Sequence, residues 1–310
     1  MITVIGSLNI DLIAKVPQPP LAGETKMGSD FHIVPGGKGA NQAIACRRAG
    51  VQTRMIGCVG QDAFGEISIQ SLIDSGVDAR HVNSVNESTG TAIIQIDDDG
   101  QNRIVIILGA NALVTKDMID VIWPEVQGST YLLLQNEIPA ETNAHILNLA
   151  QHAGMTTVLN AAPYVPLDDE VLAKVDILVV NETEATMLSG IEVVDIPSAW
   201  EATSALHARG ARCVITTLGQ NGSLYSDGQA RWYQPAIKTK AVDTTAAGDT
   251  FVGAFVAARE ANLPVDGALR FATTAASVAV SRLGAQPSIP GRDEILALLP
   301  GCPDSVATAV

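Results

Sequence analysis

The chain has 310 residues, of which 47% are hydrophobic and 17% are charged, and its formal net charge is −14. A chain of this length and composition can bury a large core, which excludes disordered and fibrous proteins. The negative charge, without any cluster of lysine and arginine, argues against nucleic acid as a partner because phosphate backbones are bound by basic patches.

The first residues and the cysteines indicate a cytoplasmic protein. Residues 1–7 contain no basic segment followed by an apolar run, and no apolar stretch of about 18 residues occurs, so we expect neither secretion nor a membrane partner. The cysteines lie far apart without a C-x-x-C pair, and the histidines form no H-x-x-x-H pattern. A zinc site is therefore not expected.

Short β-branched runs alternate with helical segments along most of the chain. The expected strands are residues 2–8, 53–59, 131–134, 156–159, 176–180 and 213–217. The expected helices are residues 40–49, 64–75, 141–153, 199–209, 250–260 and 265–282, several of which are followed by glycine. This alternation predicts an α/β fold with a mostly parallel sheet covered by helices. Only the tail after Pro300 is expected to be loosely ordered.

A second group of strands interrupts the alternation. Residues 91–97 and 102–108 are apolar or alternating runs joined by Asp98-Asp99-Gly100, which predicts a β-hairpin. Strands drawn from about residues 9–36 and 88–108 would form a small sheet. Such a sheet needs a cover for its apolar face, so it would serve as a lid or a dimer interface. The alternative is an extension of the main sheet without a function.

A glycine-rich turn, Gly36-Gly37-Lys38-Gly39-Ala40-Asn41-Gln42, ends an extended run and opens a helix. Its glycines would let a ligand approach the backbone, and Lys38 and Asn41 can form hydrogen bonds with hydroxyl groups. The turn matches neither a Walker A loop nor a dinucleotide fingerprint. A purely structural turn is the alternative.

Polar side chains also follow two apolar strands. Asn9 and Asp11 flank Ile10, so both point to one face just after the first strand, which suits hydrogen bonding to a polyol. Asn136 and Glu137 follow the strand that starts at residue 131, although a glutamate at a strand end is often only solvated.

Two further loops lie at expected carboxyl ends of strands, where α/β sheets bind ligands. Asn181 and Glu184 follow the strand 176–180; the alternative is that Asn181 caps the next helix and Glu184 completes a capping box. Residues 217–222 are glycine-rich and would form either a nucleotide-site loop or a hairpin turn.

The segment from Val242 to Phe255 places a carboxylate beside small residues where an apolar helix begins. The N–H groups of Ala246, Ala247 and Gly248 could surround an anion at the positive end of the helix dipole. Asp249 is then a candidate general base for a hydroxyl held beside that anion. The alternative is that Asp249 merely caps the helix.

In this order and spacing, these segments resemble the ribokinase and phosphofructokinase-B family of carbohydrate kinases. The resemblance runs from residues 6–11 to residues 284–288, and its signatures are residues 36–43 and 243–251. It implies a three-layer α/β sandwich with a small β lid, formed by residues 1–310 as a single domain. It also implies a homodimer joined through the lids and transfer of the γ-phosphoryl group of ATP to a primary hydroxyl of a sugar.

The resemblance also implies roles for individual residues. Asp249 would be the base, and the amides of Ala246, Ala247 and Gly248 would form the anion hole. The sugar would be bound by Asn9, Asp11, Gly37, Lys38, Gly39, Ala40, Asn41 and Glu137. The nucleotide would be bound by Asn181, Thr217, Leu218, Gly219, Gln220, Asn221, Gly222, Gly248 and Thr273. Glu184 would act on Mg²⁺ through water. A K⁺ site would use oxygens of or near Asp243, Thr245, Ala279, Arg282, Gly284 and Ser288.

This chain departs from the family pattern in places. Ala246 stands where many relatives have glycine, Asn136 stands where leucine is expected, and residues 160–163 read Asn-Ala-Ala-Pro in place of Asn-Pro-Ala-Pro. The expected acceptor is the 5-hydroxyl of D-ribose. Kinases of 2-deoxyribose, other sugars or nucleosides are alternatives, because pocket shape selects the sugar.

Two other classes of protein explain less of the sequence. A non-catalytic sugar-binding protein would account for Asn9, Asp11 and Lys38 but not for a base beside an anion hole. A nicotinamide-dependent dehydrogenase would share the α/β alternation, but the first strand lacks the glycine spacing that such enzymes need.

Overall fold

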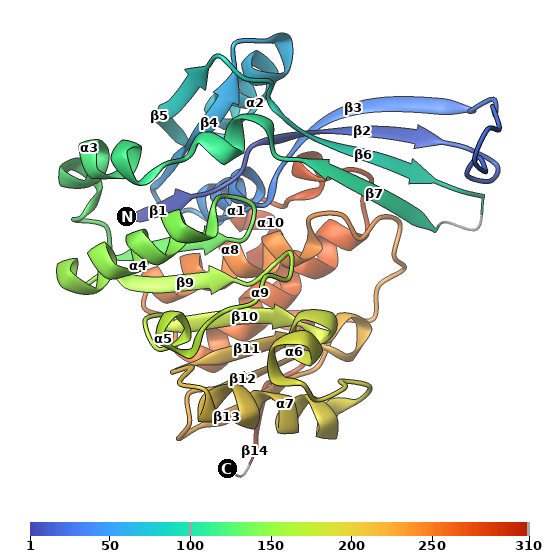
Figure 1. Cartoon of the computed structure of the whole chain (residues 1–310). Helices are drawn as coiled ribbons and strands as arrows, with labels where there is room; N and C mark the ends of the chain where they lie inside the picture. Colours follow the sequence, from blue (N-terminus) through green and yellow to red (C-terminus); the bar gives the residue numbers. More distant parts are fainter. Residues whose placement is uncertain (99–100, 309–310) are drawn as a thin grey trace.

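The computed structural model describes residues 1–98 and 101–308, so Asp99 and Gly100 of the expected hairpin turn lie outside the described residues. Within them, a ten-stranded sheet has the order β14-β13-β12-β11-β10-β9-β8-β1-β4-β5 (Figure 1). Its strands are β1 (Ile2–Ile5), β4 (Thr53–Gly60), β5 (Asp78–Val85), β8 (Tyr131–Gln135), β9 (Thr156–Asn160), β10 (Ile177–Asn181), β11 (Val214–Thr217), β12 (Ser223–Ser226), β13 (Arg231–Gln234) and β14 (Val306–Thr308). Strands β11, β10, β9, β8, β1, β4 and β5 run parallel to one another. Strands β12, β13 and β14 each run antiparallel to the strand before them.

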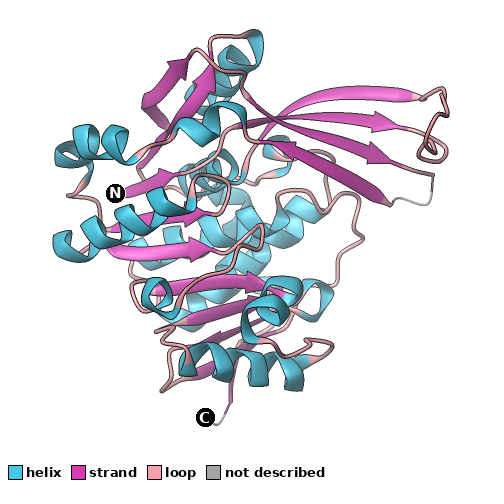
Figure 2. Ribbon diagram, viewed as in Figure 1, coloured by secondary structure: helices cyan, strands magenta, loops and turns pink. Residues whose placement is uncertain are grey.

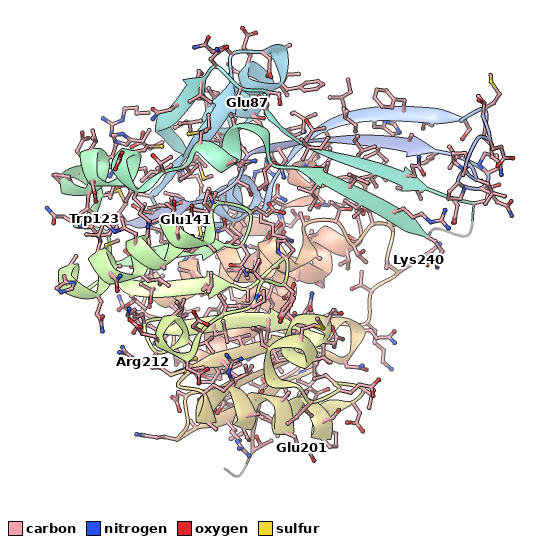
Figure 3. All side chains as sticks on the ribbon, in the orientation of Figure 1. Glu87, Trp123, Glu141, Glu201, Arg212 and Lys240 are labelled. Atoms are coloured by element: carbon pink, nitrogen blue, oxygen red, sulfur yellow. The ribbon has the colours of Figure 1, made fainter. Side chains whose placement is uncertain are left out.

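Helices cover both faces of this sheet (Figure 2). One face packs against α1 (Lys38–Arg48), α2 (Ala63–Asp74), α8 (Ala247–Glu260), α9 (Val265–Val280) and α10 (Arg292–Leu298). The other packs against α3 (Lys116–Val126), α4 (Ala140–Ala153), α5 (Asp169–Leu172), α6 (Glu182–Ser189) and α7 (Ile196–Ala208). Short 3₁₀ helices are η1 (Gly109–Leu113), η2 (Gly219–Asn221), η3 (Gln286–Ser288) and η4 (Leu299–Gly301). Glu201 on α7 marks the end of the body away from the lid in Figure 3.

The central strands are apolar on both faces because each face meets helices. In β8, Leu133 joins the core under α1, α8 and α9, while Leu132 and Leu134 join the core under α3 and α4. A parallel sheet buried on both sides reads as a continuous apolar run, which is why these strands were recognisable. The expected three-layer sandwich is confirmed.

A second sheet projects from the body (Figure 1). It has the order β3-β2-β6-β7 and is built from β2 (Asn9–Lys15), β3 (Asp30–Gly36), β6 (Gly90–Ile96) and β7 (Asn102–Ile107). At its root Asn9 pairs with Gly36 on one side and Gly90 on the other. These strands form a separate sheet, so the alternative of an extension of the main sheet is wrong.

Other details differ from the expectations. Residues 301–308 of the tail are not loose: they add β14 to the edge of the main sheet, with Trp232 of β13 paired to Ala307. The first strand ends at Ile5, because the chain turns there toward the lid. No helix in the described part of the chain is long and apolar enough to cross a membrane.

Candidate active site

The expected site residues gather at one edge of the main sheet. The neighbouring strands β11, β10, β9 and β8 end at Thr217, Asn181, Asn160 and Gln135, and the next strand, β1, leads into Ser7. Gln135 is in register with Asn160, and Asn181 is in register with Thr217. This edge is formed by the carboxyl ends of parallel strands, where open α/β sheets bind ligands.

Asp249 lies in the first turn of α8 and is only 7% exposed. Its Oδ2 accepts a hydrogen bond from Nδ2 of Asn41 at 3.0 Å, and its Oδ1 accepts one from Nε2 of Gln42 at 3.0 Å. The N-cap is Ala246, so the alternative that Asp249 caps the helix is wrong. A carboxylate held by two amides has the geometry of a positioned general base.

The turn before Asp249 brings small residues to the start of α8. Ala246 adopts a φ of 60°, a left-handed conformation that an L-residue rarely takes. The N–H of Ala247 donates to the carbonyl of Thr244 at 3.2 Å, so this expected anion-hole donor is engaged within the chain. Gly248 borders open space, since a Cβ there would meet nothing within 4 Å. An anion therefore has room next to Gly248.

Glu137 is a buried carboxylate tied to the glycine-rich turn. Its Oε2 accepts hydrogen bonds from Oγ of Ser7 at 2.5 Å and from the N–H of Lys38 at 3.1 Å. The N–H of Gly39 donates to Oγ of Ser7 at 3.2 Å, and that of Ala40 to the carbonyl of Ser7 at 3.0 Å. Three backbone donors of the turn are thus used within the protein, which leaves side chains to meet a ligand.

Two asparagines offer unused hydrogen-bonding groups. Oδ1 of Asn41 is buried and has no hydrogen-bond partner within the described residues. Asn111 of η1 donates from Nδ2 to Oδ1 of Asn9 at 2.7 Å, so the amide group of Asn9 is left to donate elsewhere. Gly37 has a φ of 90°, and a Cβ there would lie 2.7 Å from the backbone nitrogen of Asn9, so only glycine fits.

Charges at this end of the site are unbalanced. Burial, followed by repulsion from Glu137 and Asp249, raises the pKa of Asp11 to about 7, although Lys38 partly opposes the shift. Burial by itself would lower the pKa of Lys38, but Asp249, Glu137, Glu184 and Asp11 outweigh it and the pKa is raised. Several carboxylates therefore share one lysine, and the site as a whole is electronegative.

Gly248 also borders a cavity of about 830 Å³. Its lining includes seven of the expected nucleotide-binding residues: Thr217, Gly219, Gln220, Asn221, Gly222, Gly248 and Thr273. Leu218 does not line it; this side chain is 3% exposed and packs with Ala199 and Leu224. The loop before α8 contributes further residues, including Lys238.

Asn181 and Glu184 form the capping box of α6. Oδ1 of Asn181 accepts from the N–H of Glu184 at 2.8 Å, and Oε2 of Glu184 accepts from the N–H of Asn181 at 3.0 Å. The capping alternative is therefore confirmed, and neither residue is among those lining the cavity. Glu184 is buried, with 6% of its surface exposed. Burial raises its pKa, while hydrogen bonds from Asn181 and the charge of Lys38 oppose that rise.

Three of the expected K⁺ ligands are joined by hydrogen bonds. Oδ1 of Asp243 accepts from the backbone N–H of Thr245 at 2.9 Å and from its hydroxyl at 2.6 Å. Oδ2 of Asp243 accepts from the N–H of Gly284 at 2.9 Å. The loop before α8 is thus connected to the segment after α9.

The other expected K⁺ ligands are engaged within the chain. The carbonyl of Ala279 accepts from the N–H of Arg282 at 3.1 Å, and the Arg282 side chain pairs with Glu294. The hydroxyl of Ser288 is fully buried and donates to the carbonyl of Ala285 at 2.7 Å. Within residues 1–98 and 101–308, no group of three or more His, Cys, Asp or Glu side chains could hold a metal ion.

Sequence reasoning missed several residues that organise the site. Ser7 and Gln42 lie inside the two N-terminal motifs, so their position in those motifs was the signal that could have revealed them. Asn111 and Gln135 carry no local signal, because their partners are about a hundred residues away along the chain. Asn160 was noticed only as the first residue of the segment 160–163, which departs from the family pattern.

Comparison with known proteins agrees with this geometry. The model of the pfkB family carbohydrate kinases matches residues 1–292. The ribokinase of Haemophilus influenzae is 40% identical over 300 residues, covering 96% of this chain and 98% of the relative. The structure of Arabidopsis thaliana ribokinase complexed with ribose and ATP has a TM-score of 0.89 at 35% identity, covering 96% of this chain and 98% of that chain. The deoxyribokinase of Salmonella typhi is 34% identical and covers 94% of this chain and 96% of the relative. The chain belongs to the pfkB family of carbohydrate kinases.

Proposed function

We propose that this protein transfers the γ-phosphoryl group of ATP to the 5-hydroxyl of D-ribose, giving D-ribose 5-phosphate and ADP. The observation that carries the proposal is the position of Asp249. Its carboxylate is held by two amides within the electronegative cluster of Asp11, Lys38 and Glu137, and the preceding residue, Gly248, lines the cavity. A base at that junction can act on a hydroxyl from one side while the phosphoryl group arrives from the other.

The sugar end supplies the groups that a polyol requires. Asn9, Asp11, Asn41 and Glu137 are 3 to 7% exposed, and the unpartnered Oδ1 of Asn41 can accept a hydrogen bond from a sugar hydroxyl. Burying a polar atom without a partner costs free energy, so a bound sugar would recover that cost. Recognition by buried polar groups also discriminates strongly against analogues that lack a hydroxyl.

In the reaction, Asp249 takes the proton of the 5-hydroxyl as its oxygen forms a bond to the γ-phosphorus and the bond to the ADP oxygen breaks. Most of the catalysis in phosphoryl transfer comes from positioning and from stabilising charge. The start of α8 at Gly248 supplies a positive dipole end for the transferring group. The cavity holds the nucleotide through the loop after β11 and through Thr273 of α9.

Two cations are part of the proposal. Several carboxylates share Lys38, which leaves charge for Mg²⁺ bound near Glu184 through water, where the ion would neutralise the phosphates. K⁺ suits oxygens at Asp243, Thr245 and Ser288 with carbonyls near Ala279, Arg282 and Gly284, where it would hold the loop before α8. Turnover in Mg²⁺-containing buffer should fall when Na⁺ replaces K⁺; equal turnover contradicts the K⁺ site.

The lid offers a surface for a second copy of the chain. One face of its strands exposes Phe31, Ile33, Ile93, Val105 and Ile107, which are 42 to 60% exposed. Apolar side chains gathered on a small sheet are characteristic of protein interfaces. Light scattering should therefore give a dimer, and Val105→Lys should shift the protein toward the monomer. A wild-type monomer at assay concentration contradicts the proposal.

ADP formation tests the reaction and the acceptor together. D-ribose, 2-deoxyribose, fructose and adenosine are offered at equal concentrations, and kcat/KM is measured for each. D-ribose should give the highest value. The similarity to a deoxyribokinase makes 2-deoxyribose the sharpest competitor. A higher kcat/KM for another acceptor would reassign the substrate, whereas no sugar-dependent ADP formation would reject kinase activity.

A further inference from the structure

We infer that Gln42 is a positioning residue for phosphoryl transfer, and that its side-chain amide holds the Asp249 carboxylate in its working orientation. The inference rests on the proposed role of Asp249 as the base. Gln42 is fully buried on α1, whereas Asn41 beside it is 5% exposed and has an oxygen free for a ligand. Gln42 therefore acts on the reaction through Asp249.

The hydrogen bonds of Gln42 connect two neighbouring helices, α1 and α8, with the central sheet. One N–H of Nε2 donates to Oδ1 of Asp249 at 3.0 Å, and the same nitrogen donates to Oδ1 of Asn160 at 3.2 Å. Its Oε1 accepts from Nε2 of Gln135 at 2.8 Å. Asp249 on α8 is thereby tied, through α1, to the ends of β8 and β9.

The direction of this chain of hydrogen bonds is fixed by chemistry. An ionised carboxylate can only accept, so the nitrogen of Gln42 must face Asp249. The oxygen of Gln42 then faces Gln135, and it can be satisfied only by the nitrogen of Gln135. Rotating the Gln42 amide by half a turn would place oxygen against oxygen at Asp249 and at Asn160 and nitrogen against nitrogen at Gln135. One orientation is therefore strongly preferred.

The two amides that hold Asp249 differ in what they are free to do. Asn41 donates to Oδ2 of Asp249, and its own oxygen is available to the sugar. Gln42 donates to Oδ1, and all its polar atoms are used within the protein. Gln42 fixes the rotation of the Asp249 carboxylate through Oδ1. Asn41 holds Oδ2 and can at the same time bind the substrate through its own oxygen. A misplacement of about 1 Å in a reacting group can cost a hundredfold in rate.

The test uses Gln42→Met, which keeps the length of the side chain but removes both the donors and the acceptor. We expect kcat to fall about 10- to 100-fold, while the KM values for ribose and ATP change less than about threefold. Equilibrium binding of ribose, measured by calorimetry, should follow the same limit. A loss that falls mainly on KM, or a kcat within about twofold of wild type, overturns the inference.

A double-mutant cycle separates positioning from packing. Gln42→Met should lower kcat strongly in the wild-type background and hardly at all in an Asp249→Asn background, because its effect passes through the carboxylate. An equal loss in both backgrounds overturns the inference. If Asp249→Asn alone leaves kcat near wild type, the proposed base is wrong, which is a different failure.

Thr3→Val supplies the matched control for lost buried hydrogen bonding. The Thr3 hydroxyl is fully buried and shares a 2.7 Å hydrogen bond with Oγ of Ser129 at the opposite end of β1. The control should lower the melting temperature but leave kcat unchanged. If Thr3→Val lowered kcat as much as Gln42→Met does at a similar loss of melting temperature, the role of Gln42 would be structural and the inference would fail.

Discussion

The two halves of the site are built differently. The sugar end is a buried cluster of charged and amide side chains whose hydrogen bonds are mostly made within the protein, as at Glu137 and Asp249. The nucleotide half is a cavity of about 830 Å³ lined largely by small residues. Lys38 lies among the carboxylates of the first half, while Lys238 lines the second.

This contrast separates two kinds of recognition. Prearranged buried polar groups discriminate by penalising any ligand that leaves one of them unpaired. A roomy cavity lined by small residues selects mainly by shape. Changes at the sugar end should therefore alter specificity and stability together, whereas the cavity should tolerate substitution better.

Asp249→Asn should have the largest effect, because it removes the proposed base where the halves meet. We expect kcat to fall at least about a hundredfold, the lower range for losing acid–base catalysis. Steady-state ADP formation with ribose measures it. Folding and ATP binding should be preserved, as followed by circular dichroism and calorimetry. Near-normal kcat would show that the junction does not carry the chemistry.

Asp11→Asn should weaken ribose binding by about 1 to 3 kcal/mol, since it replaces a charged acceptor among buried hydrogen bonds. ATP affinity should change little if the halves are independent. The pKa of Asp11 is raised to about 7, so wild-type ribose affinity should improve as pH rises through 7, as the carboxylate ionises. The Asn variant should lose that dependence. Calorimetry from pH 5.5 to 8.5 that shows equal slopes would contradict the assignment.

Asp11→Asn should weaken ribose binding but stabilise the ligand-free fold. The pKa of Asp11 is higher in the folded protein than the ordinary value of 3.8 for an aspartate, so ionisation disfavours folding. This penalty is absent below about pH 4, grows as pH rises and is complete above about pH 7. Asp11→Asn should therefore raise the melting temperature of the ligand-free protein at pH 8 but not at pH 4. An equal shift at both values would disprove the electrostatic origin.

Ala246→Gly should have the smallest effect. A left-handed alanine costs about 1 to 2 kcal/mol, while glycine loses about 0.4 to 1 kcal/mol through the entropy of the unfolded chain. The difference favours glycine by about 0 to 1.6 kcal/mol, so the melting temperature should rise by only a few degrees. Calorimetric scanning measures it, and a lower melting temperature would mean that the turn is not strained.

The fold was largely predictable because its signals are local. The apolar runs of β8 and β10 and the helices around them follow from burial on both faces, and the observed bounds differ from the expected ones by a few residues. The strand β5, the hairpin of β12 and β13, and α3 were missed. The strand β5 (Asp78–Val85) is mixed in polarity because it lies at the edge of the sheet, so its residues lack the apolar signature of a central strand.

The site was predictable only where a motif carries its own chemistry. The proposed roles of Asp249, Asn41 and Glu137 follow from their neighbours in sequence, but the contacts at the site come from distant segments. Gln42, for example, bonds to both Asp249 and Gln135. A single sequence also could not tell whether Asp249 would cap its own helix or face α1. Only the packing of α8 against α1 decides that, and it places the carboxylate 3.0 Å from two amide nitrogens.

The close approach of backbones at the sugar end has a consequence for protein engineering. A Cβ on Gly37 would lie 2.7 Å from the nitrogen of Asn9, and one on Gly39 would lie 2.6 Å from the nitrogen of Ser7. At Gly90 it would lie 2.2 Å from the amide of Asn111. A mutational library aimed at new acceptors should leave these positions unchanged, since any side chain there would collide with the neighbouring residues of the sugar end. Productive diversity must come from side chains that the glycines leave room for, such as Asn9 and Asp11.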